Sequence, residues 1–217
     1  MQSQELLKKI ESNLSNKRLQ LSLKRLFDLL ISLILLVILS PIYLLLILWI
    51  KLDSKGEAVF KQTRVGLNGT PFTIYKFRTM VKDADKMFNR EFNRETLDNF
   101  VFQEKEDPRI TKSGKFLRKT SLDELPQLIN ILKGDMSLIG PRPEIPDIAN
   151  LYNDYEKIRL LMKPGVSGLA QVNGRGNLEL KETIKFDVTY VETFSLWNDI
   201  KIFFKTFKVV LLREGAY

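Results

Sequence analysis

The chain of 217 residues contains no cysteine and no histidine. Without these residues it cannot form a disulfide, a thiol nucleophile, a Ser-His-Asp triad or a zinc site of the usual kind. If the chain is an enzyme, its nucleophile, acid and base must come from Asp, Glu, Lys, Tyr, Ser or Thr, and the metal that suits such oxygen donors is Mg²⁺. Carboxylates are therefore the first candidates for chemistry.

The overall composition is that of a globular protein with a real core. Hydrophobic residues make up 44% of the chain and charged residues 28%, which argues against a disordered or fibrous protein. The length favours one domain plus an appendage. A net charge of +8 favours anionic partners such as nucleic acid, phospholipid headgroups or phosphorylated substrates, without choosing among them.

Charge is absent from residues 29–50, an apolar run that would rise about 33 Å as a straight helix and so could cross a bilayer core. A cleaved signal peptide fits poorly, because the run starts late, is long and lacks a small-residue cleavage site. The sequence therefore predicts a permanent membrane segment.

Ser40-Pro41 lies in the middle of this run and allows two interpretations. Proline disfavours a straight helix there, although kinked spanning helices tolerate it. Five Lys or Arg side chains lie in residues 9–28 and four in residues 51–70, so the positive-inside rule prefers neither orientation. This balance favours a re-entrant helix-break-helix hairpin with both ends in the cytoplasm over a kinked span.

The rest of the chain predicts an α+β, mainly helical fold. We expect a basic N-terminal segment at 1–25, the broken membrane helix at 26–50, and one membrane-associated cytoplasmic catalytic domain at 51–217. Asn68-Gly69 should join two short strands as a tight hairpin turn. The charged stretch 82–102 carries an irregular apolar stripe that is typical of core. Near the C-terminus, apolar residues at helical spacing predict an amphipathic helix, which packs on the core or lies on a membrane surface.

Residues 120–134 predict a single helix that carries two adjacent carboxylates, Asp123 and Glu124, near its start. Ser121 and Glu124 have capping-box spacing, and Gly134 is a typical terminator. The helix dipole should favour the ionised carboxylates, which could hold a metal or supply a nucleophile. Acidic residues in a first helical turn are commonplace, so the pair alone indicates no more than a cap.

Basic residues around this pair give it more weight. Asp107 and Arg109 precede it, Arg118 lies just before it, and Arg142 follows within a GPRP segment. Guanidinium groups bind phosphate oxygens in a bidentate manner, so the pattern predicts a phosphate site beside two carboxylates. The glycine-containing turns at 163–165 and 173–176 are, each alone, typical of structural turns.

Eight sequence blocks strongly resemble one family. They are KRLFDLLIS, FKQTRVG, YKFRTM, DPRIT, LRKTSLDELPQL, GDMSLIGPRP, KPGVSGLAQVNGR and DVTYVETFSLWNDIKI. In this order they resemble the bacterial sugar transferases, the monotopic polyprenyl-phosphate phosphoglycosyl transferases, from about Lys24 to the C-terminus. Larger members carry an additional N-terminal membrane region, so the chain looks like the minimal catalytic unit.

The resemblance implies transfer of a sugar 1-phosphate from a UDP-sugar to undecaprenyl phosphate, with release of UMP and with Mg²⁺ as cofactor. Asp123 would be the nucleophile that forms a phosphosugar-aspartyl intermediate, and Glu124 would assist at the metal, so both are expected at the Mg²⁺ site. Ser40 and Pro41 match the family's membrane break. Expected to bind phosphate or nucleotide sugar are Lys76, Arg78, Asp107, Arg109, Arg118, Pro141, Arg142, Pro143, Gln171 and Arg175.

The resemblance also implies a location and a pathway. The protein would sit on the cytoplasmic face of the bacterial inner membrane, in contact with phospholipid. It would catalyse the first membrane step of exopolysaccharide, capsule, O-antigen or glycoprotein glycan synthesis. The sequence leaves the sugar, the pathway and a homo-oligomer open.

Two rival functions rest mainly on charge. A non-catalytic membrane-anchored scaffold that binds anionic lipid in a polysaccharide assembly complex would explain the basic residues but not the carboxylate pair. Nucleic-acid binding has no recognition motif in the sequence and conflicts with the apolar run. We therefore expect no nucleic-acid partner.

Overall fold

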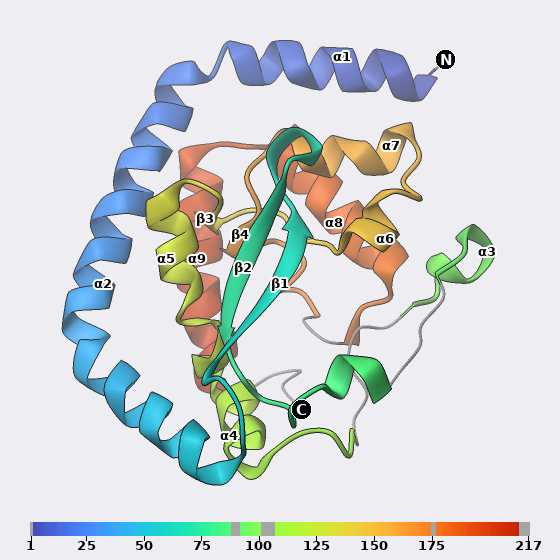
Figure 1. Cartoon of the computed structure of the whole chain (residues 1–217). Helices are drawn as coiled ribbons and strands as arrows, with labels where there is room; N and C mark the ends of the chain where they lie inside the picture. The colour runs from blue at the N-terminus through green and yellow to red at the C-terminus, as the bar shows by residue number, and fades with distance from the viewer. Residues whose placement is uncertain (1, 88–91, 101–106, 175–176, 213–217) are drawn as a thin grey trace.

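A computed structural model describes residues 2–87, 92–100, 107–174 and 177–212. Two helices lead the chain, α1 (Gln2–Ser15) and α2 (Arg18–Asp53). Figure 1 shows α2 arching around one side of the remaining chain. The described residues are mainly helical with short sheets, which confirms the predicted fold class at this level.

α2 contains Ser40 and Pro41 and is not interrupted there. Pro41 has no N–H to donate to the carbonyl of Val37, four residues earlier. The Ser40 hydroxyl donates to that carbonyl instead, at 2.8 Å. The expected break is thus replaced by a continuous, arched helix in which serine satisfies the acceptor that proline leaves unpaired (Figure 1).

The predicted hairpin is present as β1 (Val59–Val65) and β2 (Pro71–Phe77), which pair antiparallel. A short 3₁₀ turn, η1 (Leu67–Gly69), joins them, and Asn68 (φ 53°) and Gly69 (φ 80°) both adopt the left-handed region. The Thr70 N–H closes the turn on the Leu67 carbonyl at 3.1 Å. This geometry is the one that Asn-Gly favours, because Asn and Gly tolerate positive φ.

A second small sheet pairs β3 (Ser137–Ile139) with β4 (Gly165–Ser167) in parallel. The two segments approach so closely that a Cβ on Gly165 would lie 2.1 Å from the backbone nitrogen of Gly140. No side chain fits there, so the glycines of the GPRP and KPG segments are structural requirements.

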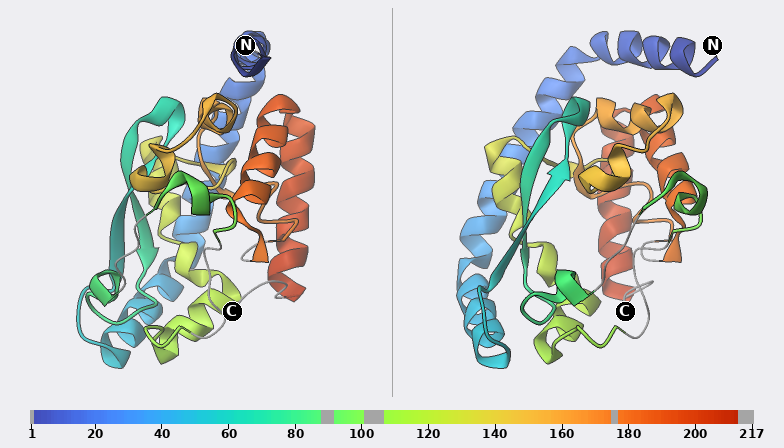
Figure 2. Two further views of the ribbon diagram at one scale, coloured as in Figure 1. Left: turned by 90° about the vertical axis from the view of Figure 1, so that its right-hand side faces the viewer. Right: turned by 45° about the vertical axis from the view of Figure 1, so that its right-hand side comes forward.

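The remaining elements are short, apart from two C-terminal helices. They are η2 (Ala84–Met87), α3 (Arg94–Leu97), α4 (Lys112–Thr120), η3 (Leu122–Glu124), α5 (Gln127–Lys133), α6 (Pro146–Ala149), α7 (Asp154–Lys157), η4 (Ile158–Leu161), α8 (Leu180–Glu192) and α9 (Leu196–Leu212). Figure 2 shows the β1–β2 hairpin and the α8–α9 pair on opposite sides of the molecule.

The single helix expected over residues 120–134 is wrong. Ser121 takes a left-handed conformation (φ 59°) that ends α4, and its side chain makes no cap for the following turn. The chain continues as η3 and then as α5, which Gly134 terminates in the left-handed region as expected (φ 95°). The capping-box spacing led to a wrong prediction of the helix start, because Ser121 is the C-cap of the preceding helix α4.

The largest core cluster packs α8 and α9 against α1, β3 and the segments at 145–162. In the stretch 82–102, Leu97 is buried in this cluster, Phe92 and Phe100 pack against it, and Met87 is exposed. Phe88 and Val101 lie outside the described residues.

Polar side chains fix the first half of α2 to the domain. Lys24 is buried and pairs with Asp199 of α9 at 2.6 Å. The Asp28 carboxylate accepts the N–H of Leu138 at 2.9 Å, and Arg25 donates to the last carbonyls of α5. These contacts explain why charged residues directly precede the apolar run of α2.

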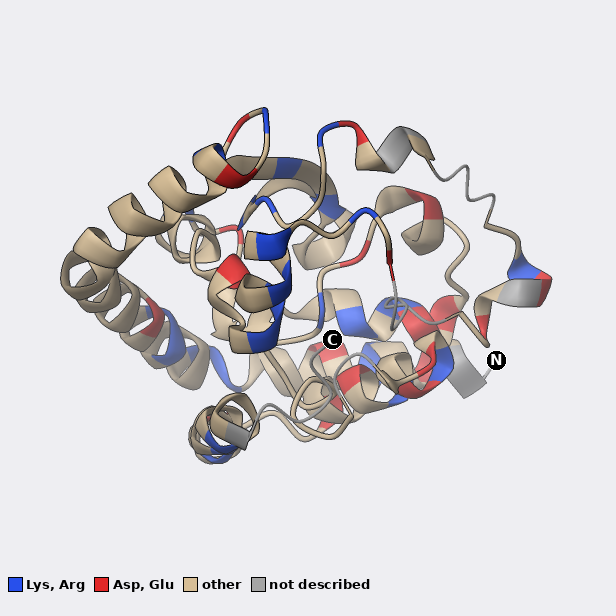
Figure 3. Ribbon diagram, turned by 90° about the horizontal axis from the view of Figure 1, so that it is seen from below, with Lys and Arg blue, Asp and Glu red and all other residues tan. Residues whose placement is uncertain are grey.

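α2 is long and apolar enough to cross a membrane, as judged by length and composition alone. Most of its apolar run faces outward, with large side chains such as Val37, Leu44 and Leu48 more than half exposed. Figure 3 shows charged residues near both ends of α2 and not along its middle. α9 also exposes Phe204, so the amphipathic C-terminal helix is confirmed and one of its faces remains open to solvent.

Candidate active site

Most of the predicted site residues line one cleft of about 1330 Å³. Its walls come from the second half of α2, the hairpin, η3 and the loop that contains Arg142. The cleft is large enough for a nucleotide sugar, since ligand sites commonly have volumes of about 300–1000 Å³. Of the predicted residues, it brings together Lys76, Arg78, Asp107, Arg109, Arg118, Asp123, Glu124 and Arg142.

The carboxylate pair is positioned by the turn between α4 and α5. The left-handed Ser121 reverses the chain, so that η3 presents Asp123 and Glu124 to the cleft. The Tyr43 hydroxyl of α2 donates to the carbonyl of Leu125 just beyond the pair. The long helix therefore supports the turn directly.

Burial raises the pKa of Asp123 to about 6, and the adjacent charge of Glu124 adds to the increase. Lys76 and Arg118 act in the opposite direction by stabilising the carboxylate. The expected dipole effect therefore does not dominate, because desolvation and like charge outweigh it. With this pKa, Asp123 is still mostly ionised at neutral pH.

Two cations flank the pair. Lys76 of β2 contacts Glu124 at 3.1 Å. Arg118 of α4 donates through Nε to the Thr79 hydroxyl at 3.0 Å. Burial lowers the pKa of Arg118, which the Asp123 charge opposes, and the guanidinium keeps its positive charge beside the nucleophile candidate.

Asp107 and Arg109 form a bidentate ion pair in the cleft wall, with contacts of 2.8 and 2.6 Å. Hydrogen bonds from the Arg109 side chain lower the pKa of Asp107. Because Asp107 is ionised and paired in this way, it holds the guanidinium of Arg109 at the cleft edge.

Arg78 lines the cleft and is also held by contacts with the end of α2. Its guanidinium is buried and donates to the Ser54 hydroxyl (2.9 Å) and to backbone carbonyls of Ile50, Ser54 and Glu57. Arg78 borders the cleft, and these contacts make it an anchor for the C-terminal end of α2.

The backbone of Arg142 is held by a buried ion pair between Arg159 and Asp187. Arg159 donates to the Arg142 carbonyl at 2.8 Å, while Asp187 accepts the Arg142 N–H at 3.2 Å. Burial acts to lower the pKa of Arg159, but nearby Tyr152, Asp187 and Glu144 raise it above its ordinary value. The backbone N–H and the backbone carbonyl of Arg142 are thus each held by a charged side chain.

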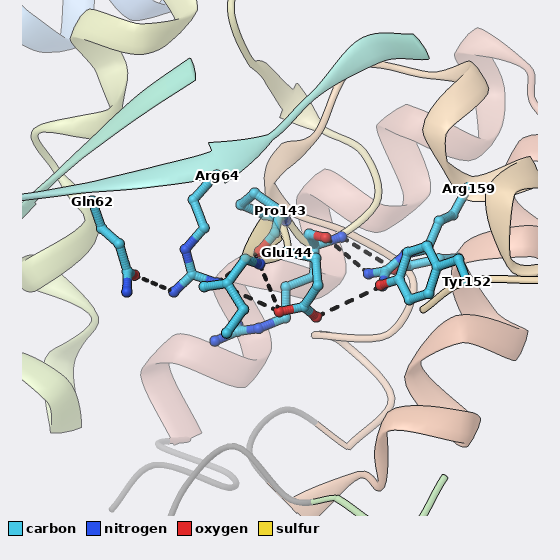
Figure 4. A network of polar contacts seen from close by, with 9 residues as sticks. Gln62, Arg64, Pro143, Glu144, Tyr152 and Arg159 are labelled. Carbon is cyan, nitrogen blue, oxygen red and sulfur yellow. Dashed lines mark hydrogen bonds and ion pairs between the residues drawn. The ribbon is translucent and has the colours of Figure 1, made fainter. Parts of the chain in front are cut away.

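Arg64 and Glu144 also line the cleft and extend this network. Arg64 donates to the Pro143 carbonyl at 3.2 Å and lies 3.7 Å from Glu144 (Figure 4). Sequence reasoning missed both, although Arg64 lies in the FKQTRVG block and Glu144 directly follows GPRP.

The other predicted residues differ in position. Pro141 and Pro143 flank Arg142 in its loop, and neither lines the large cleft or the smaller cavity. Gln171 borders a second, smaller cavity. Arg175 lies outside the described residues.

The protein oxygens near the cleft centre fit one particular mode of metal binding. No group of three or more acidic side chains gathers within the described ranges, so an all-protein cage is not formed there. Asp123 and Glu124 supply two adjacent carboxylates, the donor set with which Mg²⁺ is held when substrate phosphates and water complete its coordination. The residues therefore fit a shared protein–substrate Mg²⁺ site.

Comparison with known sequences matches residues 19–213 to the bacterial sugar transferase family. The chain belongs to this family. It is 45% identical to the undecaprenyl-phosphate galactose phosphotransferase of Salmonella typhimurium, over 98% of this chain and 45% of that relative. It is 40% identical to the exopolysaccharide production protein ExoY of Sinorhizobium fredii, over 89% of this chain and 88% of ExoY.

A third relative is the UDP-glucose:undecaprenyl-phosphate glucose-1-phosphate transferase of Caulobacter vibrioides, which is 40% identical over 89% of this chain and 72% of its own length. The chain spans less than half the length of several relatives that it matches. These include the Salmonella phosphotransferase and a galactosyl transferase of Streptococcus agalactiae. Family membership, inferred from the sequence blocks, is confirmed.

Proposed function

We propose that the chain transfers a sugar 1-phosphate from a UDP-sugar to undecaprenyl phosphate, in two steps through Asp123. The observation that carries the proposal is the placement of Asp123 in a large cleft, beside Glu124 and between Lys76 and Arg118. The names of the Salmonella and Caulobacter relatives describe sugar-phosphate transfer to undecaprenyl phosphate.

In the first step, an Asp123 carboxylate oxygen bonds to the phosphorus that carries the sugar. The bond from that phosphorus to the oxygen bridging the two phosphates breaks, and UMP leaves with the bonding electrons. Arg118 lies where it can neutralise charge on the phosphoryl oxygens. Neither bond change requires a proton, which suits a chain without histidine.

In the second step, a phosphate oxygen of undecaprenyl phosphate attacks the same phosphorus. The bond to Asp123 breaks, and the carboxylate is regenerated. The acceptor phosphate is ionised near neutral pH and needs little general-base help. A Mg²⁺ ion held with Asp123 and Glu124 would supply additional positive charge for the phosphate oxygens.

The proposal places the protein on the cytoplasmic face of the bacterial inner membrane. The exposed apolar face of α2 supports membrane insertion, and the arched course of α2 in Figure 1 supports entry into and return from one leaflet. Such a position lets a soluble nucleotide sugar meet a lipid acceptor at the membrane surface. The product would begin assembly of a bacterial surface glycan such as an exopolysaccharide. The name of the relative ExoY refers to exopolysaccharide production.

The test is a UMP-release assay with a panel of UDP-sugars and Mg²⁺, with and without undecaprenyl phosphate. We expect sustained UMP release with one or a few donors, dependent on the lipid. Absence of UMP with every donor, together with binding to anionic vesicles, would favour the scaffold alternative and refute the enzyme.

A further inference from the structure

A second cavity, of about 320 Å³, lies against the same carboxylate pair. Asp123, Glu124, Arg118 and Arg142 line both this cavity and the large cleft. The reactive carboxylate of the proposed function is therefore reached from two spaces, which differ in size and in the chemistry of their walls.

The second cavity has mainly apolar walls contributed by three helices and a strand. Leu35 of α2, Leu128 of α5, Val166 of β4 and Val210 of α9 face it. By contrast, the large cleft is lined by many charged groups from the hairpin and the loops. A nucleotide sugar suits the polar cleft, whereas the smaller cavity suits an apolar ligand with one anionic end.

The position of Leu35 connects this cavity to the membrane segment. Leu35 lies within the uncharged run of α2, and its neighbours Ile34 and Val37 are 55% and 67% exposed on the outer face. One face of this stretch of α2 therefore looks outward, while Leu35 faces the cavity beside Asp123. Figure 1 shows α2 beside α5, and the two helices are in contact.

We propose that this cavity, here called the acceptor cavity, binds the phosphate end and the first isoprene units of the polyprenyl phosphate. The assignment rests on the proposed function. Arg118 and Arg142 line it and complement a phosphate, and the apolar walls suit a branched hydrocarbon. Its volume admits only the head of such a lipid, so the rest of the chain lies along the outer face of α2.

In this arrangement the two substrates occupy different spaces beside Asp123. The donor leaves its sugar phosphate on Asp123 from the polar cleft, and the acceptor phosphate approaches from the other side. The new bond joins an acceptor phosphate oxygen to the sugar-bearing phosphorus as the bond to Asp123 breaks.

The first test separates the two half-reactions in variants that fill the acceptor cavity from two different helices, Leu35→Trp on α2 and Val210→Trp on α9. We expect single-turnover UMP release without lipid to stay within about twofold of wild type, while transfer to undecaprenyl phosphate falls by about tenfold or more. Leu211→Trp is the matched control, because Leu211 is 79% exposed on α9 outside the cavity and should affect neither step.

Intact donor-only UMP release also shows that each variant has folded. Wild-type rates of lipid transfer in both variants would overturn the assignment, as would equal loss of both half-reactions. If wild-type protein released no UMP from any donor, the proposed function would fail. The assignment of the acceptor cavity would then depend on the lipid-binding test alone.

The second test measures that binding in protein that cannot turn over, Asp123→Asn. A single cysteine is introduced as Val210→Cys in this cysteine-free chain, and its alkylation rate is followed with each lipid. We expect undecaprenyl phosphate to slow alkylation by about fivefold or more, and phosphatidylglycerol at equal charge not to. Equal protection by both lipids, or by neither, would refute specific acceptor binding, with Leu211→Cys as the unprotected control.

Discussion

Asp187 accepts a hydrogen bond from the backbone N–H of Arg142, although the two residues are 45 positions apart. Arg159 pairs with the same carboxylate and donates to the Arg142 carbonyl. Both side chains of this pair are buried. The orientation of Arg142 at the cleft therefore depends on an ion pair that does not line the cleft itself.

Removing one member of this pair should be worse than removing both. Arg159→Met leaves the Asp187 charge buried and unpaired, which costs about 3–5 kcal/mol of stability. The double variant Arg159→Met/Asp187→Leu replaces the ion pair with an apolar pair and should lose less stability than Arg159→Met. Denaturant unfolding of wild type, Arg159→Met, Asp187→Leu and the double variant measures the difference, and a double variant that is less stable than either single variant would contradict this expectation.

Arg118 and Arg142 should contribute to catalysis through phosphate contacts. Arg118→Ala and Arg142→Ala should each raise the activation free energy by about 1.5–3 kcal/mol, which is roughly a 10- to 150-fold loss of kcat/KM. Arg18→Ala is a matched control, because Arg18 is exposed at the start of α2. UMP-release kinetics check this, and losses under about twofold would place the two arginines outside the site.

Asp123 should destabilise the fold at neutral pH. Its pKa is raised to about 6 in the folded protein, so the unfolded carboxyl loses its proton at lower pH than the folded one. Folding stability should therefore fall as pH rises from about 4 to about 6.

In the absence of metal and substrate, Asp123→Asn should then be more stable than wild type by about 3 kcal/mol at pH 7.5, and the difference should fall below about 1 kcal/mol at pH 4. Thermal unfolding across this pH range measures it. Glu11→Gln, an exposed change on α1, should show no such pH dependence. A constant difference between Asp123→Asn and wild type would contradict the raised pKa.

Membrane topology can be tested from the two ends of the arched α2. In Lys9→Cys and Lys55→Cys variants, both positions are exposed and flank the apolar run. We expect neither to react with an impermeant thiol reagent in intact cells and both to react after permeabilisation. Reaction of just one in intact cells would show that the helix spans the membrane.

The sequence predicted those features whose cause is local. Asn68-Gly69 predicted the hairpin because these residues tolerate the positive φ of its turn, and Gly134 predicted the end of α5 for the same reason. The carboxylate pair and most of its cations were found because they lie within short, distinctive segments around one turn.

Features that depend on distant contacts were missed or misinterpreted. The Arg159–Asp187 pair joins segments 28 positions apart, so no local pattern reports it. Arg78 stays a predicted phosphate-binding residue, but its additional contacts with the end of α2 could not be read from the sequence, because they join segments that are distant in the chain. Ser121 could equally end one helix or begin the next, and in the structure its left-handed conformation ends α4.

The measurement that tests the central claim most directly is intact-protein mass spectrometry after incubation with the accepted UDP-sugar and Mg²⁺, without lipid acceptor. We expect release of about one UMP per protein, and a covalent sugar-phosphate adduct that maps to Asp123 and is absent from Asp123→Asn. If wild-type protein turns over with lipid but shows neither UMP release nor an adduct without it, or if the adduct persists in Asp123→Asn, then Asp123 is not the nucleophile.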